Sequence, residues 1–375
     1  MVSGSMFGDA YRCKTVLLTG HTGFKGSWMA EWLLMLGARV VGFSHKVDDG
    51  PSHFDSLGLA DRMTHILGDV RDADALYDVV TAHKPDYVFH LAAQSLVRYS
   101  YDHPVETMAT NVMGTVNLLD ALRRAGHPAA VVCVTSDKCY ENREVLSGYR
   151  EDDPMGGHDT YSASKGAAEI VAHSYRRSFF SGPDSPVKMA TVRAGNVIGG
   201  GDWSLDRIVP DCVRSLAKGE AIRLRNPHAT RPWQHVLESL SGYLWLGALL
   251  GGAATTARVK SPTDVTEAFN FGPWVEANGS VERLVTEFLK HWPGTWVNAA
   301  EAGAVHEAGL LGLSIDKAYH KLGWAPTLDF AGGVALTAGW YKAVVADQAP
   351  ALDRTRHDIE TFVAEARAKS LAWAA

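Results

Sequence analysis

Short apolar runs alternate with segments of helical spacing through the first half of the chain. Six runs rich in β-branched and apolar residues predict strands at Thr15–Leu18, Arg39–Phe43, His65–Leu67, Tyr87–His90, Ala130–Thr135 and Lys188–Ala194. The segments between them predict amphipathic helices over Gly26–Leu36, Ala73–His83, Pro104–Ala125 and Tyr161–Phe179. Because alternating strands and helices are typical of a parallel sheet covered on both faces, we expect an α/β fold with a Rossmann-type doubly wound parallel sheet.

The pattern changes after Arg193, where Gly, Pro, Trp and Arg become frequent and irregular stretches separate the helical segments. This region predicts a smaller, mostly helical domain built from separated segments, because the apolar helix expected over Val236–Leu250 is suited to return to the main sheet. We expect the sheet domain to span residues 13–195 and 232–262, the smaller domain residues 196–231 and 263–345, and terminal extensions residues 1–12 and 346–375. The first extension is expected to be disordered, and the last to end in an exposed charged helix.

Composition narrows the class of protein. The chain has 375 residues with 36 basic and 42 acidic side chains, so its formal net charge of −6 gives no electrostatic case for binding nucleic acid or an anionic membrane. Without a signal-peptide pattern or an apolar stretch long enough to span a bilayer, a cytoplasmic protein is expected. The cysteines lack metal-ligand spacing and are interpreted as buried thiols, with no metal site: Cys13, Cys133, Cys139 and Cys212.

A glycine-rich segment follows the first predicted strand and opens a helix, which is the setting in which such a turn binds the pyrophosphate of a dinucleotide. Glycines let the backbone approach the phosphates, and the N-terminus of the helix supplies unpaired N–H groups. An ordinary tight turn is the alternative. The candidate cofactor contacts here are Gly20, Thr22, Gly23, Phe24, Lys25 and Gly26.

Two further strand ends are candidates for cofactor contacts. The second strand lacks the usual terminal carboxylate, so NAD is favoured over NADP only weakly; Lys46 could accept a 2′-phosphate or be a solvated lysine. After the third strand come Asp69 and Val70, where Asp69 either accepts a hydrogen bond from the adenine amino group or caps the next helix. The fourth strand ends in small residues that form a cofactor floor or simply pack tightly: Leu91, Ala92, Ala93 and Gln94.

Tyr161 and Lys165 begin a predicted helix, and their spacing of four places both side chains on one face. A lysine charge there can lower the pKa of the tyrosine toward that of a general base, although such pairs also occur incidentally. The strand end that precedes this helix carries Ser136, Asp137 and Lys138. Together with the glycine turn, these residues indicate a redox site that uses a dinucleotide.

These motifs resemble the extended short-chain dehydrogenase/reductases, and the resemblance covers about Thr15 to Trp324. Several longer strings resemble the branch of nucleotide-sugar 4,6-dehydratases that act on CDP-glucose: Gly20–Trp28, Ser136–Tyr140, Arg193–Trp203 and Arg231–Val236. The related dTDP-glucose enzymes carry an Asp-Glu pair where this chain has Asp137 and Lys138, which favours the CDP branch.

The resemblance implies an NAD-dependent lyase that converts CDP-D-glucose to CDP-4-keto-6-deoxy-D-glucose in deoxysugar biosynthesis for surface polysaccharides such as the lipopolysaccharide O-antigen. Tyr161, with Ser136 holding the substrate hydroxyl, would take the proton from the oxygen on carbon 4. Lys165 would also bind the nicotinamide ribose, and Asp137 would be the acid that expels water. We assign the base at carbon 5 to Lys138 by its position, which requires a neutral amine. The alternative for Asp137 and Lys138 is a plain exposed ion pair.

The resemblance also suggests the substrate contacts and the assembly. Asn196, Arg207 and Arg231 match positions near the nucleotide, and arginines suit a diphosphate because they supply forked donors. Each arginine alone could instead be a surface residue. A homodimer is expected on the helices over 104–125 and 161–179. The alternatives are a dehydratase or epimerase for another nucleotide-sugar and a non-catalytic dinucleotide-sensing protein.

Overall fold

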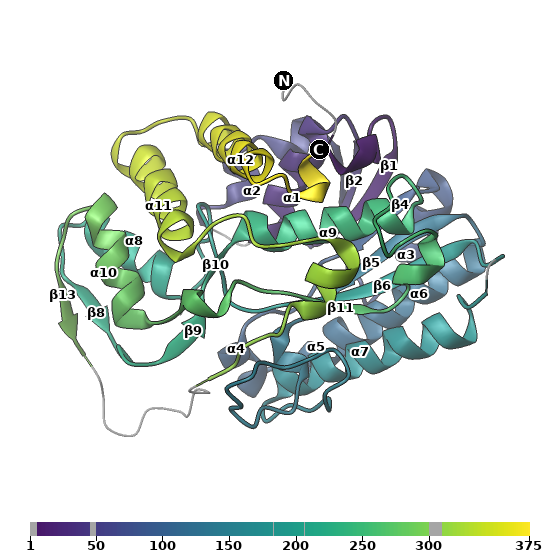
Figure 1. The fold of residues 1–375 in the computed structure, drawn as a ribbon, viewed down its shortest axis with the longest axis horizontal. Helices are drawn as coiled ribbons and strands as arrows, with labels where there is room; N and C mark the ends of the chain where they lie inside the picture. Colours follow the sequence, from purple (N-terminus) through teal and green to yellow (C-terminus); the bar gives the residue numbers. More distant parts are fainter. Residues whose placement is uncertain (1–5, 46–49, 183, 206, 300–309) are drawn as a thin grey trace.

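A computed structural model describes residues 6–45, 50–182, 184–205, 207–299 and 310–375. Its centre is a parallel sheet of seven strands in the order β11-β6-β5-β4-β1-β2-β3 (Figure 1). The strands are β1 (Thr15–Thr19), β2 (Arg39–Ser44), β3 (Thr64–Leu67), β4 (Tyr87–His90), β5 (Ala129–Val134), β6 (Val187–Ala194) and β11 (Ala268–Phe271). The doubly wound sheet and its first six strands are confirmed, while β11 was not predicted.

Helices cover both faces of the sheet, as Figure 1 shows. One face is covered by α3 (Ala73–His83), α6 (Gly114–Ala125) and α7 (Thr160–Ser178), and the other by α1 (Phe24–Met35), α9 (Val236–Leu250) and α12 (Ala351–Ala368). Within β1, Val16 and Leu18 join the core under α1 and α9, whereas Leu17 joins the core under α3 and α6. Since successive strand residues point to opposite faces, a strand buried on both sides must be apolar throughout.

The helix expected over residues 104–125 is interrupted. It consists of α5 (Pro104–Met108), a π-helical turn η3 (Ala109–Met113) and α6, with α4 (Val97–Asp102) before it. The π-helical turn contains the buried Asn111, which hydrogen-bonds away from its own helix. Such turns are frequent near functional sites.

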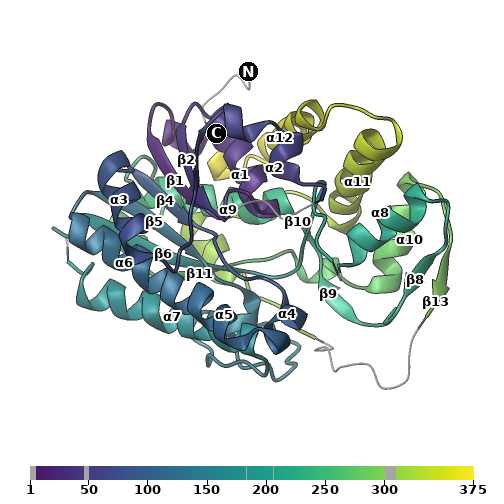
Figure 2. The same cartoon turned by 180° about the vertical axis from the view of Figure 1, so that it is seen from behind.

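A smaller, mostly helical part lies beside the carboxyl ends of the strands (Figure 2). It contains α8 (Ile208–Ala217), α10 (Val281–His291) and α11 (Phe330–Tyr341) with two strand pairs, β8 (Ile222–Leu224) with β13 (Trp296–Asn298) and β9 (Thr230–Pro232) with β12 (Asn278–Ser280). Residues 268–271 depart from the expected division, because they form β11 in the main sheet. We propose that the smaller domain otherwise follows the expected segments.

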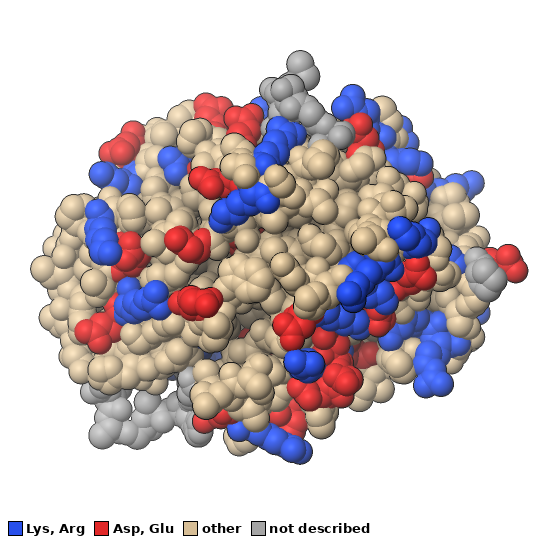
Figure 3. Space-filling view, in the orientation of Figure 1, with Lys and Arg blue, Asp and Glu red and all other residues tan. Residues whose placement is uncertain are grey.

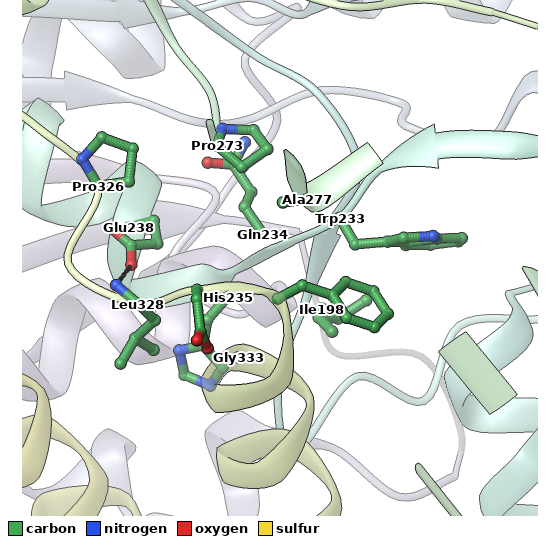
Figure 4. A pocket seen from close by; sticks show the side chains of 12 residues that line it. Ile198, Trp233, Gln234, His235, Glu238, Pro273, Ala277, Pro326, Leu328 and Gly333 are labelled. Carbon is green, nitrogen blue, oxygen red and sulfur yellow. Dashed lines mark hydrogen bonds between the residues drawn. The ribbon is translucent and has the colours of Figure 1, made fainter. Parts of the chain in front are cut away.

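The two parts meet around a small cavity beside β7 (Val197–Ile198) and β10 (Gln234–His235), which pair in parallel. In Figure 4, the Glu238 side chain reaches from α9 to the backbone of Leu328. Its carboxylate accepts N–H groups of Thr327 at 2.9 Å and Leu328 at 2.6 Å. Burial nevertheless raises the pKa of Glu238 to about 7. This carboxylate therefore holds the segment that leads to α11 against the main sheet.

The described parts of both terminal extensions, residues 6–12 and 346–375, pack against the core, contrary to expectation. Phe7 and Trp373 have no exposed surface, and their rings stack with centroids 5.2 Å apart. The Arg356 guanidinium of α12 donates to the buried Glu31 carboxylate of α1 at 2.7 Å. The sequence expectation failed because the charges of α12 hide an apolar stripe that only the packed helix brings together. Residues 1–5 lie outside the described part.

The surface charges, the hydropathy of the helices and the cysteines can be compared with the expectations from the sequence. Acidic and basic side chains are interspersed over the face seen in Figure 3. Among the described residues, no helix combines the length and hydropathy that a membrane crossing requires. Cys133, Cys139 and Cys212 are buried free thiols as predicted, but Cys13 is exposed because it lies in the turn before β1.

The packing of α12 yields a stability prediction. Phe362→Ala should destabilise the protein by about 3–5 kcal/mol, because it leaves a cavity where a fully buried ring was. Glu360→Ala, at an exposed position of the same helix, is the matched control and should change stability by less than about 0.5 kcal/mol. Denaturant titration measures both; equal stabilities for the two variants would mean that α12 is not packed.

Candidate functional site

The glycine turn after β1 is shaped by close approach of backbone to backbone. Gly20 has φ +76°, and a Cβ there would lie 2.6 Å from the nitrogen of Ala92. A Cβ on Gly26 would lie 2.1 Å from the carbonyl oxygen of Gly20. Gly23 is exposed and precedes the first residue of α1, so the unpaired N–H groups of that helix end face the turn. The turn can therefore receive a phosphate group directly on the backbone.

Side chains of the same turn anchor it on both sides. The Thr22 hydroxyl lies 2.7 Å from the Ser44 hydroxyl at the end of β2. Phe24 packs against the core under α9. Lys25 points inward, and its ammonium donates to the Tyr243 hydroxyl of α9 at 3.2 Å.

Asp69 lies after β3 and is held by two basic neighbours. Its carboxylate accepts from the Arg71 Nε at 2.7 Å and lies 3.0 Å from the His45 Nε2. Burial raises the pKa of Asp69, but Arg71 and His45 outweigh it and lower the pKa to about 2. Asp69 does not cap the next helix, because Asp72 accepts the N–H groups at the start of α3. The alternative that Asp69 caps α3 is therefore wrong.

Other predicted residues line the same edge of the sheet. Val70 is buried after β3, and Lys46 lies outside the described residues. The segment after β4 is partly buried and comprises Leu91, Ala92, Ala93 and Gln94. Asn111 fixes it, accepting the Gln94 N–H at 2.8 Å and donating to the Gln94 carbonyl at 3.0 Å. The segment is thus held rigidly against the glycine turn.

Ser136 and Asp137 follow β5 and form a buried pair. The Ser136 hydroxyl donates to Asp137 Oδ1 at 2.9 Å, and it also hydrogen-bonds the Tyr161 phenol of α7. Asp137 is only 3% exposed, and its Oδ2 has no hydrogen-bond partner within the described part of the chain. The structure therefore brings the carboxyl, the hydroxyl and the phenol together as the sequence predicted.

Tyr161 and Lys165 share a face of α7, with the Lys165 ammonium 5.9 Å from the centre of the Tyr161 ring. Burial raises the pKa of Tyr161 to about 12, against lowering contributions from Ser136 and Arg207. Burial also lowers the pKa of Lys165 to about 8. The expected lowering of the tyrosine pKa is therefore not found, because the site is more deeply buried than the spacing alone indicates.

Asp137 is a buried carboxyl beside Tyr161 that could act as an acid. Burial raises its pKa, while Lys138, Ser136 and Lys25 act in the opposite direction. The partly buried Lys138 donates its backbone N–H to the Ser136 hydroxyl at 3.2 Å. A carboxyl in this position is biased toward its protonated form, which is the form that can give a proton to a leaving group.

The three predicted substrate residues differ in their placement. Arg207, just before α8, contributes to the electrostatics of Tyr161 and Lys25 and bonds to Asp202 at 3.4 Å. Asn196 follows β6, and its carbonyl accepts the Gln234 N–H at 3.3 Å. Arg231 lies on β9 and donates to the Thr230 carbonyl at 2.8 Å. Arg207 is therefore the one for which these contacts show a link to Tyr161 and Lys25.

Several residues that build the site were not predicted from the sequence. Glu169 and Arg193 form a buried ion pair with two hydrogen bonds at 2.9 and 3.0 Å, which ties α7 to β6. The signal for Glu169 was its position four residues after Lys165, on the same helical face. Tyr243 lies in a helix that looked like plain core, and its sequence gave no signal for a site.

Comparison with known proteins agrees with this geometry. The family model described as GDP-mannose 4,6 dehydratase matches residues 17–337. CDP-glucose 4,6-dehydratase from Salmonella typhimurium is 45% identical over 335 residues, covering 88% of this chain and 91% of that protein. The structure of dTDP-glucose 4,6-dehydratase from Bacillus anthracis in complex with NAD superposes with a TM-score of 0.72 at 20% identity, covering 88% of this chain and 97% of the other. UDP-glucose 4-epimerase from Thermotoga maritima with UDP-glucose gives 0.73 at 21% identity, with 88% and 99% coverage. The two structural likenesses support the fold.

Proposed function

Because the chain belongs to the GDP-mannose 4,6 dehydratase family, we propose that it is an NAD-dependent lyase that converts CDP-D-glucose to CDP-4-keto-6-deoxy-D-glucose and water. The observation that most directly supports this reaction is the buried pair of Ser136 and Asp137 beside Tyr161. It places an acid suited to elimination next to a tyrosine suited to the redox step. The choice of the cytidine nucleotide is supported by the 45% identical relative.

The glycine turn and the neighbouring strand ends fit NAD. Any side chain at Gly20 would collide with the Ala92 backbone, so glycine here lets the turn pack closely against the end of β4, as in turns that bind a pyrophosphate. Asp69, Val70 and the residues from Leu91 to Gln94 lie at the same edge of the sheet, where Asp69 would accept a hydrogen bond from adenine and Lys165 would bind the nicotinamide ribose. NAD held there would supply the hydride acceptor for carbon 4 and, once reduced, the hydride donor for carbon 6.

Tyr161 takes the proton of the hydroxyl on carbon 4. Ser136 holds that hydroxyl, because its own hydroxyl already lies between the phenol and Asp137. The high pKa of Tyr161 requires nearby positive charge to form a phenolate; Arg207 acts in that direction, and the Lys165 ammonium lies 5.9 Å from the centre of the ring.

Elimination uses the pair after β5. The ketone at carbon 4 acidifies the hydrogen on carbon 5, which Lys138 removes as the base. Asp137 donates its proton to the hydroxyl on carbon 6 as that bond breaks, which fits a buried carboxyl with a raised pKa. Asn196, Arg207 and Arg231 hold the nucleotide, with the arginines directed to the diphosphate.

We place the enzyme in the cytoplasm, in deoxysugar biosynthesis for surface polysaccharide such as lipopolysaccharide. We also propose a homodimer formed by the helices over residues 104–125 and 161–179, which comprise α5, η3, α6 and α7. Three apolar side chains are exposed on these elements, Val105 at 81%, Met113 at 49% and Ile170 at 62%. A second copy that packs its own helices there would remove this surface from water.

The proposed reaction predicts the product of a direct incubation. With NAD and a panel of glucose nucleotides, the protein should release one water from CDP-glucose, which mass spectrometry detects. Water loss only from another glucose nucleotide would assign that compound as the substrate instead. If every compound stayed intact, the proposed dehydratase activity would be refuted.

Substitutions should separate the two steps. Tyr161→Phe should abolish oxidation, because no phenol remains to take the proton of the hydroxyl on carbon 4. Asp137→Asn should instead let NADH accumulate, because elimination stalls after oxidation; absorbance of NADH and mass spectrometry follow both. Normal dehydration by Asp137→Asn would exclude Asp137 as the acid.

The proposed dimer predicts a change of mass in solution. Ile170→Lys combined with Val105→Glu should convert dimers to monomers in light scattering, because charges would be buried in the interface. Val297→Glu, at an exposed apolar position of β13, serves as the control and should stay dimeric. A monomeric unmodified protein would contradict the proposal.

A further inference from the structure

Thr135 lies where the hydrogen bonding of the sheet ends and the residues of the proposed reaction begin. It follows β5, and its backbone N–H donates to the Val192 carbonyl of β6 at 2.9 Å. The pairing of β5 reaches Cys133 on the side of β4 and Val134 on the side of β6. Ser136, the next residue, lies beyond this pairing. Its position relative to α7 is therefore set by contacts other than those of the sheet.

A side-chain hydrogen bond ties this strand end to α7. The Thr135 hydroxyl donates to Glu169 Oε1 at 2.5 Å. The same hydroxyl lies 3.2 Å from the Val192 carbonyl, but it has one proton, and the charged acceptor at the shorter distance is the stronger one. Glu169 lies on α7, eight residues after Tyr161. Because the Ser136 hydroxyl meets the same helix at Tyr161, two successive residues are joined to α7 at two points.

Glu169 is a fixed anchor for this bond. Its buried carboxylate accepts two N–H groups of Arg193, at 3.0 Å on Oε1 and 2.9 Å on Oε2. The Thr191 hydroxyl of β6 donates to Oε2 at 2.8 Å. Burial raises the pKa of Glu169, but Arg193 and the two hydroxyl donors outweigh it and hold that pKa below its usual value. The carboxylate is therefore ionised at neutral pH, and it cannot turn away from Thr135 without losing its other bonds.

The two threonines on this carboxylate differ in what they hold. Thr191 lies inside β6, which pairs with β5 on one side and β11 on the other, so the sheet fixes it without its side chain. Thr135 lies past the pairing of β5 and directly before Ser136. Loss of the Thr135 hydroxyl should therefore free the strand end that carries Ser136, whereas loss of the Thr191 hydroxyl should not.

We propose that Thr135 is a positioning residue whose hydrogen bond to Glu169 sets the strand end after β5 against α7 for the oxidation step. The groups that it aligns are the Ser136 hydroxyl and the Tyr161 phenol. This inference rests on the proposed function. In that step ionised Tyr161 takes the proton of the hydroxyl on carbon 4, the hydride of carbon 4 passes to NAD, and carbon 4 becomes a ketone. Thr135 acts only through the position of Ser136.

Oxidation can be measured alone with CDP-6-deoxyglucose, which has no hydroxyl on carbon 6 to expel. A single turnover on the protein with NAD should form NADH and stop at the ketone, and rapid-mixing absorbance gives the rate constant. Thr135→Val removes the hydroxyl but keeps the shape of the side chain. It should lower this rate constant about tenfold, because small displacements of reacting groups cost much of the rate. A loss of folded protein would lower the amplitude of the signal and leave its rate constant in place.

The pH dependence of oxidation gives a second measurement. Burial raises the pKa of Tyr161 to about 12, and the Ser136 hydrogen bond opposes this change. A Ser136 hydroxyl that moves away should therefore raise the pKa further. Because oxidation needs the ionised phenol, the pH below which the rate falls should be higher in Thr135→Val. The other groups that face the phenol are unchanged in this variant: Asp137, Asp159, Lys165, Arg207 and Tyr243.

Two variants serve as matched controls. Thr135→Ser keeps the hydroxyl and should oxidise the analogue at nearly the rate of the unmodified protein. Thr191→Val removes the other hydroxyl from the same carboxylate by the same change of side chain, and it should alter neither the rate constant nor its pH dependence. If Thr135→Val does not fold, Thr135→Ala, whose side chain needs less room, carries the test.

Failure of this inference and failure of the proposed function give different results. If the unmodified protein forms NADH but the Thr135 variant without a hydroxyl reacts equally fast, the positioning role is overturned. Equal slowing in Thr191→Val would overturn it as well. If the unmodified protein neither forms NADH from the analogue nor releases water from CDP-glucose, the proposed function itself is refuted.

A measurement that needs no reaction examines the same alignment. Fluorine NMR of the protein labelled with fluorotyrosine should show one signal that is lost in Tyr161→Phe. That signal should move in Thr135→Val, because the hydrogen bond from Ser136 to the phenol changes, and it should stay in place in Thr191→Val. An unmoved signal in Thr135→Val would overturn the inference, and this result decides the question where the analogue does not react.

Discussion

The burial of one carboxyl group at the end of β5 is the constraint on which the rest of the site depends. Asp137 is almost fully withdrawn from water, so its ionised form exists only as far as neighbouring groups stabilise it. Ser136 supplies a hydrogen bond, and Lys138 and Lys25 supply positive charge. A group balanced in this way can hold a proton and release it, which is what the expulsion of a hydroxyl requires.

The fold provides that environment by bringing four elements to the carboxyl edge of one parallel sheet. Asp137 follows β5, Tyr161 and Lys165 lie on α7, the glycine turn precedes α1, and Tyr243 of α9 packs behind Lys25. The buried pair of Glu169 and Arg193 fixes α7 against β6. Tyr161 and Lys165 are thereby held on a rigid element, which is what the proposed reaction requires of them.

The sequence predicted much of this arrangement because its signals are local. Strand and helix positions follow from the period of apolar residues, and the glycine turn and the Tyr161 and Lys165 pair lie within single short segments. The predictions failed where distant segments decide the outcome. The burial of Trp373 depends on Phe7, the inward direction of Lys25 depends on Tyr243, and the raised pKa of Tyr161 depends on how deeply α7 is covered. The role of Asp69 as a possible cap was undecided because only the folded loop shows that Asp72 takes that place.

The protonation state of Asp137 is the most direct measurement of the central claim. Infrared difference spectroscopy of the unmodified protein against Asp137→Asn isolates the carboxyl band of this residue as pH is changed. We expect its protonated band to persist above the pH at which exposed aspartates, with a pKa of about 3.9, have ionised. A band that disappears together with those of exposed aspartates would contradict the account, because an acid already ionised at low pH could not protonate the departing hydroxyl.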